Sequence, residues 1–210
     1  MINVLITGIG GGGIGEQIIK TLKISSLDLR LFGSDTTRLS KNISEVEKMF
    51  ILKPAYSNSY CTDLINICLL NSINVIFPGS EPELKAISDN RGLFEDNNIF
   101  LPINPKKVID ICLDKVKTVD FLKNNGFDFP RSVQVKEEKD FDNVDFYPAV
   151  LKPSIGGSGS SNIMLAQNKD ELVVFGNYLL KIYDEFIIQE YIGVPEHEYT
   201  IGVLMSMDGE

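Results

Sequence analysis

An apolar run leads directly into a glycine-rich turn in INVLITGIGGGGIG, residues 2–15. This order predicts a strand at Ile2 to Ile6, a tight turn, and a helix at Gly15 to Leu22. Overlapping G-x-G-x-x-G patterns, starting at Gly8 and at Gly10, match the fingerprint of a dinucleotide site, in which glycines let the backbone approach a pyrophosphate. Six glycines in eight residues also produce such matches by chance, so the stretch fits the first turn of any open α/β sheet equally well.

The first hundred residues alternate between short apolar runs and helix-like stretches. Further strands are predicted at Asp28 to Gly33, Met49 to Leu52, Val75 to Pro78 and Asn98 to Leu101, with helices at Cys61 to Leu70 and Pro82 to Asp89. Continuous apolar strands are typical of a parallel sheet covered on both faces, so we expect a doubly wound, mostly parallel α/β domain. Asp35 then lies where a dinucleotide site would hold ribose. Ser80 and Glu81 lie at the carboxyl edge of the sheet, where such folds bind ligands.

Composition and charge exclude several classes of function. With 43% hydrophobic and 23% charged residues, the 210-residue chain resembles a globular protein of one or two domains. A net charge of −9 without a basic stripe argues against nucleic acid as a partner. No apolar run approaches the ~20 residues of a membrane span and no signal peptide is recognisable, so we expect no membrane partner and a cytoplasmic location. Cys61, Cys68 and Cys112 form no C-x-x-C pair, which disfavours a metal site. His197 is the only histidine, which disfavours a catalytic triad.

A second pattern begins at Asn104 and divides the chain into predicted domains of residues 1–103 and 104–210. Asn104 can cap a helix that has Pro105 at its first position, Asp114 can cap a second helix, and Gly126 can end it in the left-handed conformation. Strands are predicted at Ser132 to Val135, Ala149 to Lys152, Ile163 to Ala166, Phe186 to Tyr191 and Tyr199 to Ser206, with a helix at Lys169 to Tyr183 capped by Asn168 and Glu171. The final Asp208-Gly209 is a hairpin signal without a return strand, so we expect the chain to be a piece of a longer protein.

Two segments of this second part carry recognisable chemistry. In YPAVLKPSIGGSGSSNI, residues 147–163, Lys152 precedes a glycine–serine loop whose N–H groups and hydroxyls could fold over a polyphosphate. It is not a Walker loop, because the lysine comes before the glycines, and a flexible hairpin that binds nothing is the alternative. In FIIQEYIGVPEHEYTIGVL, residues 186–204, Gln189 and Glu198 could present an amide and a carboxylate to a nucleoside. The alternative there is an edge strand with polar residues facing water.

Taken together, these segments resemble the ATP-grasp superfamily, in the style of the carbamoyl-phosphate synthase large subunit and related carboxylate–amine ligases. The resemblance is carried by CLDKVKTVDFLKNNGFDFP around Lys115, VLKPSIGGSGSSN around Lys152, and IIQEYIGVPEHEYTIGVLMSMDGE. The first hundred residues look like the pre-ATP-grasp domain of that superfamily, and FPGSEPEL is similar to its strand-end segment. The resemblance implies a doubly wound, mostly parallel α/β domain followed by a partial α+β ATP-grasp domain with an antiparallel lid.

The resemblance also implies a nucleotide site. Lys115 would approach the α-phosphate side of ATP and Lys152 would bridge the α- and β-phosphates. The loop that would close over the β- and γ-phosphates contains Ser154, Gly156, Gly157, Ser158, Gly159, Ser160 and Ser161. Gln189 would face the adenine amino group, with Glu190 and Ile192 contacting adenine through their backbones. Glu198 would hold the ribose hydroxyls, with Glu196 as the runner-up. The resemblance names no catalytic residue, and it implies Mg²⁺ ligands downstream of residue 210.

The implied activity is that of an ATP-dependent ligase that activates a small carboxylate as an acyl phosphate and transfers it to an amine. ATP, Mg²⁺ and these two substrates are the implied ligands, and a homodimer is compatible with the resemblance. The chain as given is expected to be inactive without its metal site. Under this interpretation, Gly8 to Gly15 form a strand-to-helix turn that could contact an anion. Asp35 is then no longer expected to bind the ribose of a dinucleotide. A non-catalytic nucleotide-binding module and an NAD-dependent oxidoreductase remain the alternatives.

Overall fold

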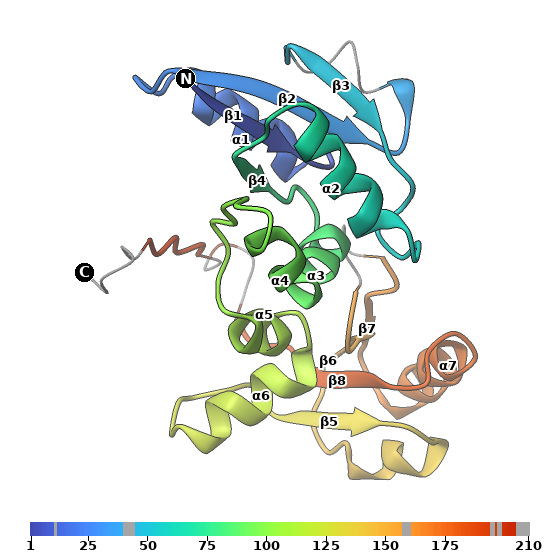
Figure 1. Ribbon diagram of the computed structural model, residues 1–210. Helices are drawn as coiled ribbons and strands as arrows, with labels where there is room; N and C mark the ends of the chain where they lie inside the picture. The colour runs from blue at the N-terminus through green and yellow to red at the C-terminus, as the bar shows by residue number, and fades with distance from the viewer. Residues whose placement is uncertain (11, 40–44, 157–160, 194–195, 197–198, 205–210) are drawn as a thin grey trace. The chain divides into compact units, whose positions relative to one another are not determined.

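The computed structural model describes the chain except residues 11, 40–44, 157–160, 194–195, 197–198 and 205–210 (Figure 1). The chain divides into two compact units, Met1–Asp114 and Lys115–Glu210. None of the helices that the structure describes has the length and apolarity needed to span a bilayer.

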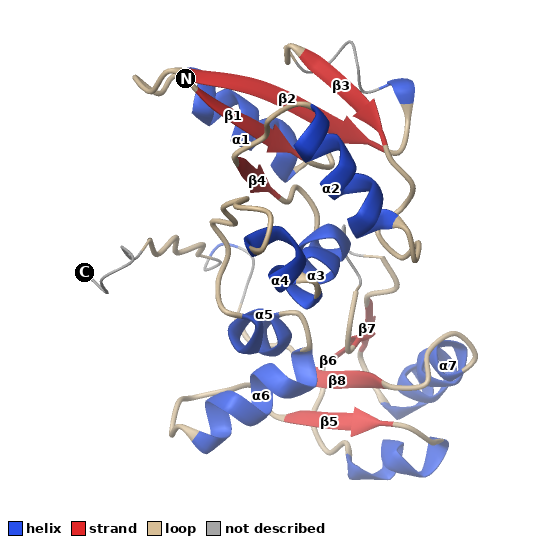
Figure 2. Cartoon of the chain, in the orientation of Figure 1, coloured by secondary structure: helices blue, strands red, loops and turns tan. Residues whose placement is uncertain are grey.

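The first unit contains a parallel sheet. Its strand order is β3-β2-β1-β4, with the bounds Lys48–Ile51, Leu29–Asp35, Ile2–Ile6 and Val75–Phe77 (Figure 2). Leu5 of the central strand pairs with Phe32 on one side and Ile76 on the other. The predicted strand at Asn98 to Leu101 is reduced to a single parallel bridge between Val75 and Phe100.

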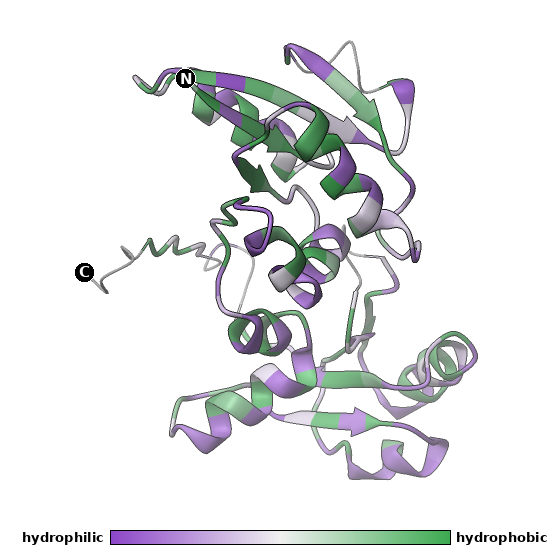
Figure 3. Cartoon of the chain, in the orientation of Figure 1, coloured by the Kyte–Doolittle hydropathy of each residue, from purple (hydrophilic) through white to green (hydrophobic). Residues whose placement is uncertain are grey.

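Helices cover both faces of this sheet, as expected for a doubly wound domain. Alternation along the strands sends Val4, Ile6 and Leu31 to one face, where they pack with Ile19 of α1 (Ile14–Lys23). On the other face, Leu5, Phe32 and Ile76 pack with buried residues of α2 (Tyr60–Leu70), α3 (Glu81–Asp89) and α4 (Arg91–Glu95). Strand β4 is hydrophobic along its whole length because both of its faces are covered (Figure 3).

Helix α5 (Lys106–Cys112) ends the first unit. Its N-cap is Pro105, one residue later than the predicted cap at Asn104, and the Asn104 carbonyl accepts a hydrogen bond of 2.6 Å from Arg91 Nη2. Lys106 also pairs with Asp89 of α3. The contacts to Arg91 and Asp89 attach α5 to the first unit, although the sequence places this helix in the second domain.

The second unit contains an antiparallel sheet. Its strand order is β5-β8-β6-β7, with the bounds Ser132–Val135, Phe186–Glu190, Ala149–Pro153 and Met164–Ala166. Helix α6 (Lys115–Asn124) precedes the sheet, and Gly126 follows its end with a φ of +74°, the left-handed conformation that was predicted for the stop. Helix α7 (Lys169–Leu180) covers one face, and Asn168 caps it by accepting the Glu171 N–H at 3.0 Å, as predicted. The core of this face contains Val135, Leu151, Leu172, Leu179, Phe186 and Ile188.

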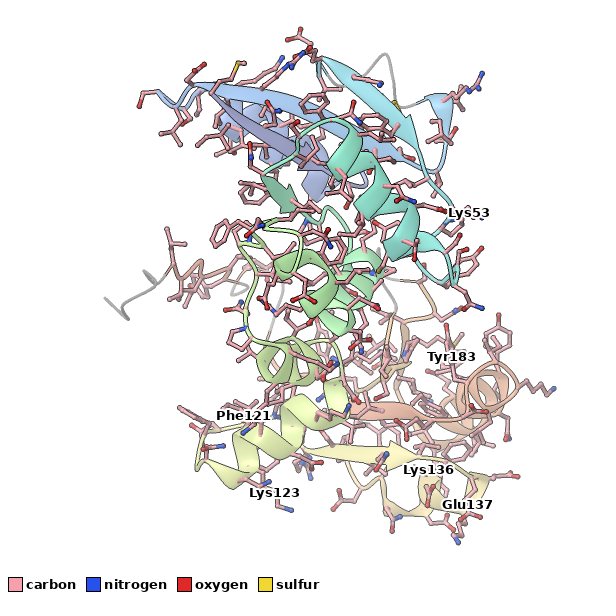
Figure 4. The ribbon with its side chains drawn as sticks, in the orientation of Figure 1. Lys53, Phe121, Lys123, Lys136, Glu137 and Tyr183 are labelled. Carbon is pink, nitrogen blue, oxygen red and sulfur yellow. The ribbon has the colours of Figure 1, made fainter. Side chains whose placement is uncertain are left out.

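Two short features, helix α4 and the 3₁₀ helix that follows β5, escaped the sequence analysis, and one predicted strand is wrong. The 3₁₀ helix η2 (Glu138–Asn143) starts where Asp140 accepts the N–H groups of Lys136 and Glu137, which Figure 4 labels at the end of β5. Residues 199–204, the described part of the predicted strand Tyr199 to Ser206, contain no strand. They have no ladder partner in the described part of the chain, and a strand without one is not stable.

Candidate nucleotide site

Lys152 and Gln189 lie on one face of the antiparallel sheet. In the ladders, Lys152 pairs with Ile187, and Gln189 pairs with Val150 and with Ser132. Directly paired residues point to the same face, and successive residues alternate. Since Leu151 and Ile188 point into the core under α7, the two predicted site residues share the opposite face.

The Lys152 ammonium is half-buried and faces another cation. Burial lowers the pKa of Lys152 below its ordinary value, and the positive charge of Lys115 lowers this pKa further. Among the described residues, no carboxylate contributes to that shift. A half-buried ammonium beside another cation is unfavourable, so this position suits an anionic ligand that would stabilise the charged form.

Lys115 holds the start of the glycine–serine loop at two points. Its backbone N–H donates to the Ser154 carbonyl at 2.9 Å, and its Nζ donates to the Gly156 carbonyl at 2.9 Å. Gly156 has a φ of +80° with open space around its Cα, so it can turn the chain where a larger residue would be strained. Both lysines therefore lie at the base of the loop. Ser161, at the end of the loop, is exposed, whereas Gly157, Ser158, Gly159 and Ser160 lie outside the described residues.

The predicted adenine segment is fixed to the strand beside it. Gln189 is 8% exposed, and its Nε2 donates to Ser132 Oγ at 3.0 Å. The Glu190 N–H donates to the Arg131 carbonyl at 2.9 Å, and its carboxylate accepts two bonds of 3.2 Å from the Arg131 guanidinium. This pairing holds the pKa of Glu190 below its ordinary value. Ile192 and Glu196 are exposed, and Glu198 lies outside the described residues, as does His197.

Arg131 and Ser132 were not found by sequence reasoning. The Arg131 guanidinium lies 4.8 Å from the centre of the Phe146 ring and pairs with Asp145 at 3.3 Å, so it braces the end of β8. Their roles depend on which residue of β5 is opposite which residue of β8. That register cannot be read from either strand alone.

The glycine turn of the first unit lies against two carboxylates, Asp35 and Glu83. Asp35 accepts the Gly10 N–H at 2.8 Å and the Thr37 N–H at 3.1 Å, which gives it a structural role at the end of β2. Gly8 has a φ of +57°, and a Cβ there would come within 2.6 Å of Glu83 Oε2. The turn therefore needs glycine in order to pack against a buried acid, whether or not it binds an anion.

Glu83, not Glu81, is the buried acid at this edge. Glu83 accepts hydrogen bonds from Tyr60 Oη at 3.1 Å and from Ser80 Oγ at 2.7 Å. Glu81, the first residue of α3, lies after β4 at the predicted edge but is exposed, because two residues of helix turn a side chain to the far face. Among the described residues, no group of three or more His, Cys, Asp or Glu side chains could hold a metal ion.

Two family models match the chain in succession. Residues 4–101 match the PylC-like N-terminal domain, and residues 112–208 match the ATP-grasp domain. No curated protein matches the chain significantly.

Solved structures share the fold at low identity. The chain is similar to L-amino acid ligase from Bacillus licheniformis (17% identity, TM-score 0.68), with 91% of this chain and 44% of that chain covered. It is similar to the biotin carboxylase domain of 2-oxoglutarate carboxylase from Hydrogenobacter thermophilus, in complex with MgADP, ADP and bicarbonate (21% identity, TM-score 0.66). That match covers 90% of this chain and 44% of the other chain. It is also similar to N5-carboxyaminoimidazole ribonucleotide synthetase from Thermotoga maritima (18% identity, TM-score 0.63). That match covers 93% of this chain and 47% of the other chain.

The chain thus spans less than half the length of each of these three proteins. Identities this low establish the fold and not the substrate. The fold consists of a parallel α/β unit followed by a unit with an antiparallel sheet. Residues 4–101 match the PylC-like N-terminal domain and residues 112–208 match the ATP-grasp domain, so the two matches follow each other in the same order as the two units.

Proposed function

We propose that the protein is an ATP-dependent carboxylate–amine ligase that binds its nucleotide on the face of the antiparallel sheet that carries Lys152 and Gln189. The observation that supports this most directly is the meeting of two lysines at the base of one glycine–serine loop. Lys115 bonds to the Gly156 carbonyl, and its charge lowers the pKa of Lys152. Both residues lie in the segment that matches the ATP-grasp domain.

The donors of this face suit the phosphates of ATP. Two ammonium groups would offset their charge, with Lys115 on the α-phosphate side and Lys152 between the α- and β-phosphates. The loop from Ser154 to Ser161 would cover the β- and γ-phosphates with backbone N–H groups and hydroxyls. The backbones of Glu190 and Ile192 would contact adenine, and Glu198 or Glu196 would hold the ribose hydroxyls.

The proposed reaction has two steps. A carboxylate oxygen of the first substrate attacks the γ-phosphorus of ATP. The bond from that phosphorus to the bridging oxygen breaks, and ADP leaves. The amine nitrogen then attacks the carbonyl carbon of the acyl phosphate, loses a proton and expels inorganic phosphate to give an amide. Positioning and charge neutralisation by the two lysines are the contributions of this chain.

A carbamoyl-phosphate synthase type of enzyme, with bicarbonate as the acid, is the finer form of this proposal. The structural neighbours include one bound to bicarbonate and one amino acid ligase, so the fold is compatible with either kind of acid. We propose MgATP as the nucleotide. The described residues do not form a site for Mg²⁺, and no step is assigned to the metal here.

We also propose a boundary between family domains at residues 103 and 104. The first family match ends at residue 101 and the second begins at residue 112, so this boundary falls between them. Helix α5 then belongs to the ATP-grasp sequence while it packs on the first compact unit.

Replacing Lys152 with methionine tests the nucleotide site. Methionine keeps the apolar stem and removes the charge, so Lys152→Met should weaken ATP binding by about 1.5–3 kcal/mol, or roughly 10- to 150-fold, the scale of a charge-assisted hydrogen bond. Titration calorimetry on the full-length protein measures this. Lys123→Met, at an exposed position of α6 (Figure 4), is the matched control and should bind ATP as the parent does. Equal affinity of Lys152→Met and the parent would remove the basis of the proposal.

A further inference from the structure

Ser132 and Gln189 face each other across the β5–β8 ladder. The two residues are directly paired, and Gln189 Nε2 donates to Ser132 Oγ at 3.0 Å. Ser132 Oγ in turn donates to the Pro130 carbonyl at 2.7 Å. The three groups form a short chain of hydrogen bonds that ends on a backbone oxygen.

The Pro130 carbonyl sets the donor and acceptor of each hydrogen bond in this network. The Pro130 carbonyl can only accept, so it takes the single proton of the Ser132 hydroxyl. The hydroxyl oxygen must then accept from its other neighbour, and only the NH₂ end of the Gln189 amide can donate. The flipped amide would bring two acceptor oxygens together. Although amide orientation is normally ambiguous, here the network allows one orientation.

The opposite end of the amide is therefore an acceptor. The described part of the chain supplies no hydrogen bond to Gln189 Oε1, although the residue is only 8% exposed. On the same face, Lys152 pairs with Ile187, two residues before Gln189 on β8. One end of this face thus carries a cation and the other carries a hydrogen-bond acceptor of fixed orientation, in the order of the phosphates and the base of a nucleotide.

We infer that Ser132 determines the base specificity of the nucleotide site, by holding Gln189 Oε1 toward position 6 of a purine. This inference rests on the proposed function. A 6-amino purine donates a hydrogen bond to Oε1, whereas a 6-oxo purine presents a second acceptor to it. Ser132 is a positioning residue, because it acts on the ligand only through the Gln189 amide.

The test compares ATP with ITP, because these nucleotides differ only in the hydrogen-bonding pattern of the six-membered ring around position 6. The measured quantity is the ratio of the dissociation constants of ITP and ATP in the full-length protein. A mispaired polar group in a buried site reduces affinity by about tenfold or more, so the parent should prefer ATP by roughly that factor.

Ser132→Val and Ser132→Thr form the matched pair of variants, because valine and threonine have the same shape and only threonine keeps the hydroxyl. In Ser132→Val the amide is free to turn, and the ratio should fall at least about threefold toward one. In Ser132→Thr the ratio should stay near that of the parent. A general loss of packing would weaken ATP and ITP together in both variants and leave the ratio unchanged.

The outcomes separate the inference from the function on which it depends. If the parent prefers ATP and Ser132→Val keeps that preference, the inference is wrong and the nucleotide site stands. A parent that binds ATP and ITP equally would also overturn the inference. If the parent binds neither nucleotide, the proposed function fails and the inference fails with it.

Discussion

At the scale of single residues, the Glu83 carboxyl is a buried acid of the first unit. It is 8% exposed and accepts hydrogen bonds from Tyr60 and Ser80 beside the turn after β1. Burial raises the pKa of Glu83 above its ordinary value, and the charge of Asp35 also raises it, while its hydrogen bonds oppose the shift. The effect of burial on the pKa of Glu83 is larger than the opposing effect of its hydrogen bonds, so folding shifts the equilibrium toward the protonated acid.

Glu83 should therefore make stability depend on pH. Because its pKa is raised in the folded state, that state holds more protons than the unfolded chain above the unfolded pKa of ~4.3. The contribution of Glu83 to the free energy of unfolding is complete below that pH and is lost as pH rises through the folded pKa. Glu83→Gln cannot titrate, so its stability relative to the parent should increase with pH over this window. Urea unfolding at a series of pH values measures the difference, with Glu81→Gln as the exposed control on α3. A difference that stays constant with pH would contradict this assignment.

At the scale of helices and strands, local sequence patterns were sufficient to predict where an element begins when a cap or an apolar run defines it. The bounds of β1 and β5 agree with the prediction, and α7 begins at its predicted cap. The pattern failed for α4 and η2, which are short and depend on tertiary burial of Phe94 and Phe141. Such residues pack because of neighbours distant in sequence, and single-sequence periodicity does not contain that information.

Two helical glycines should respond to alanine with opposite signs. A Cβ at Gly15 of α1 would lie 2.5 Å from the Gly8 carbonyl oxygen and 2.7 Å from that of Thr7, and backbone atoms cannot easily move away. Gly15→Ala should therefore lower the free energy of unfolding by about 1–3 kcal/mol. Gly92 of α4 has open space around it, so Gly92→Ala should raise that free energy by roughly 0.5–1 kcal/mol through helix propensity. Urea unfolding of the two variants decides this. Equal shifts of the same sign would show that the turn relaxes around the added methyl group.

At the scale of the whole molecule, the order of motifs along the chain predicted the class of fold. Lys115 and Lys152 are 37 positions apart and both lie at the start of one loop, and their role toward phosphates stays a prediction. The sequence could not supply the network that orients Gln189, because Ser132 becomes its neighbour only through the β5–β8 register. Nor could it supply the acid and the amine, since one fold serves ligases with different substrates.

The choice between an ATP site and a dinucleotide site can be tested on the intact protein. Free ATP at 100 times its dissociation constant should stabilise the unit that binds it by about 2.7 kcal/mol and raise its melting temperature by several degrees. NADH should give no saturable shift, because both oxygens of the Asp35 carboxylate already accept backbone N–H groups, from Gly10 and Thr37. Thermal unfolding with each nucleotide measures these shifts. Lys152→Met should lose most of the shift with ATP, whereas Asp35→Asn should keep it. Saturable stabilisation by NADH that disappears in Asp35→Asn would return the glycine turn to a dinucleotide role and overturn the assignment to ATP.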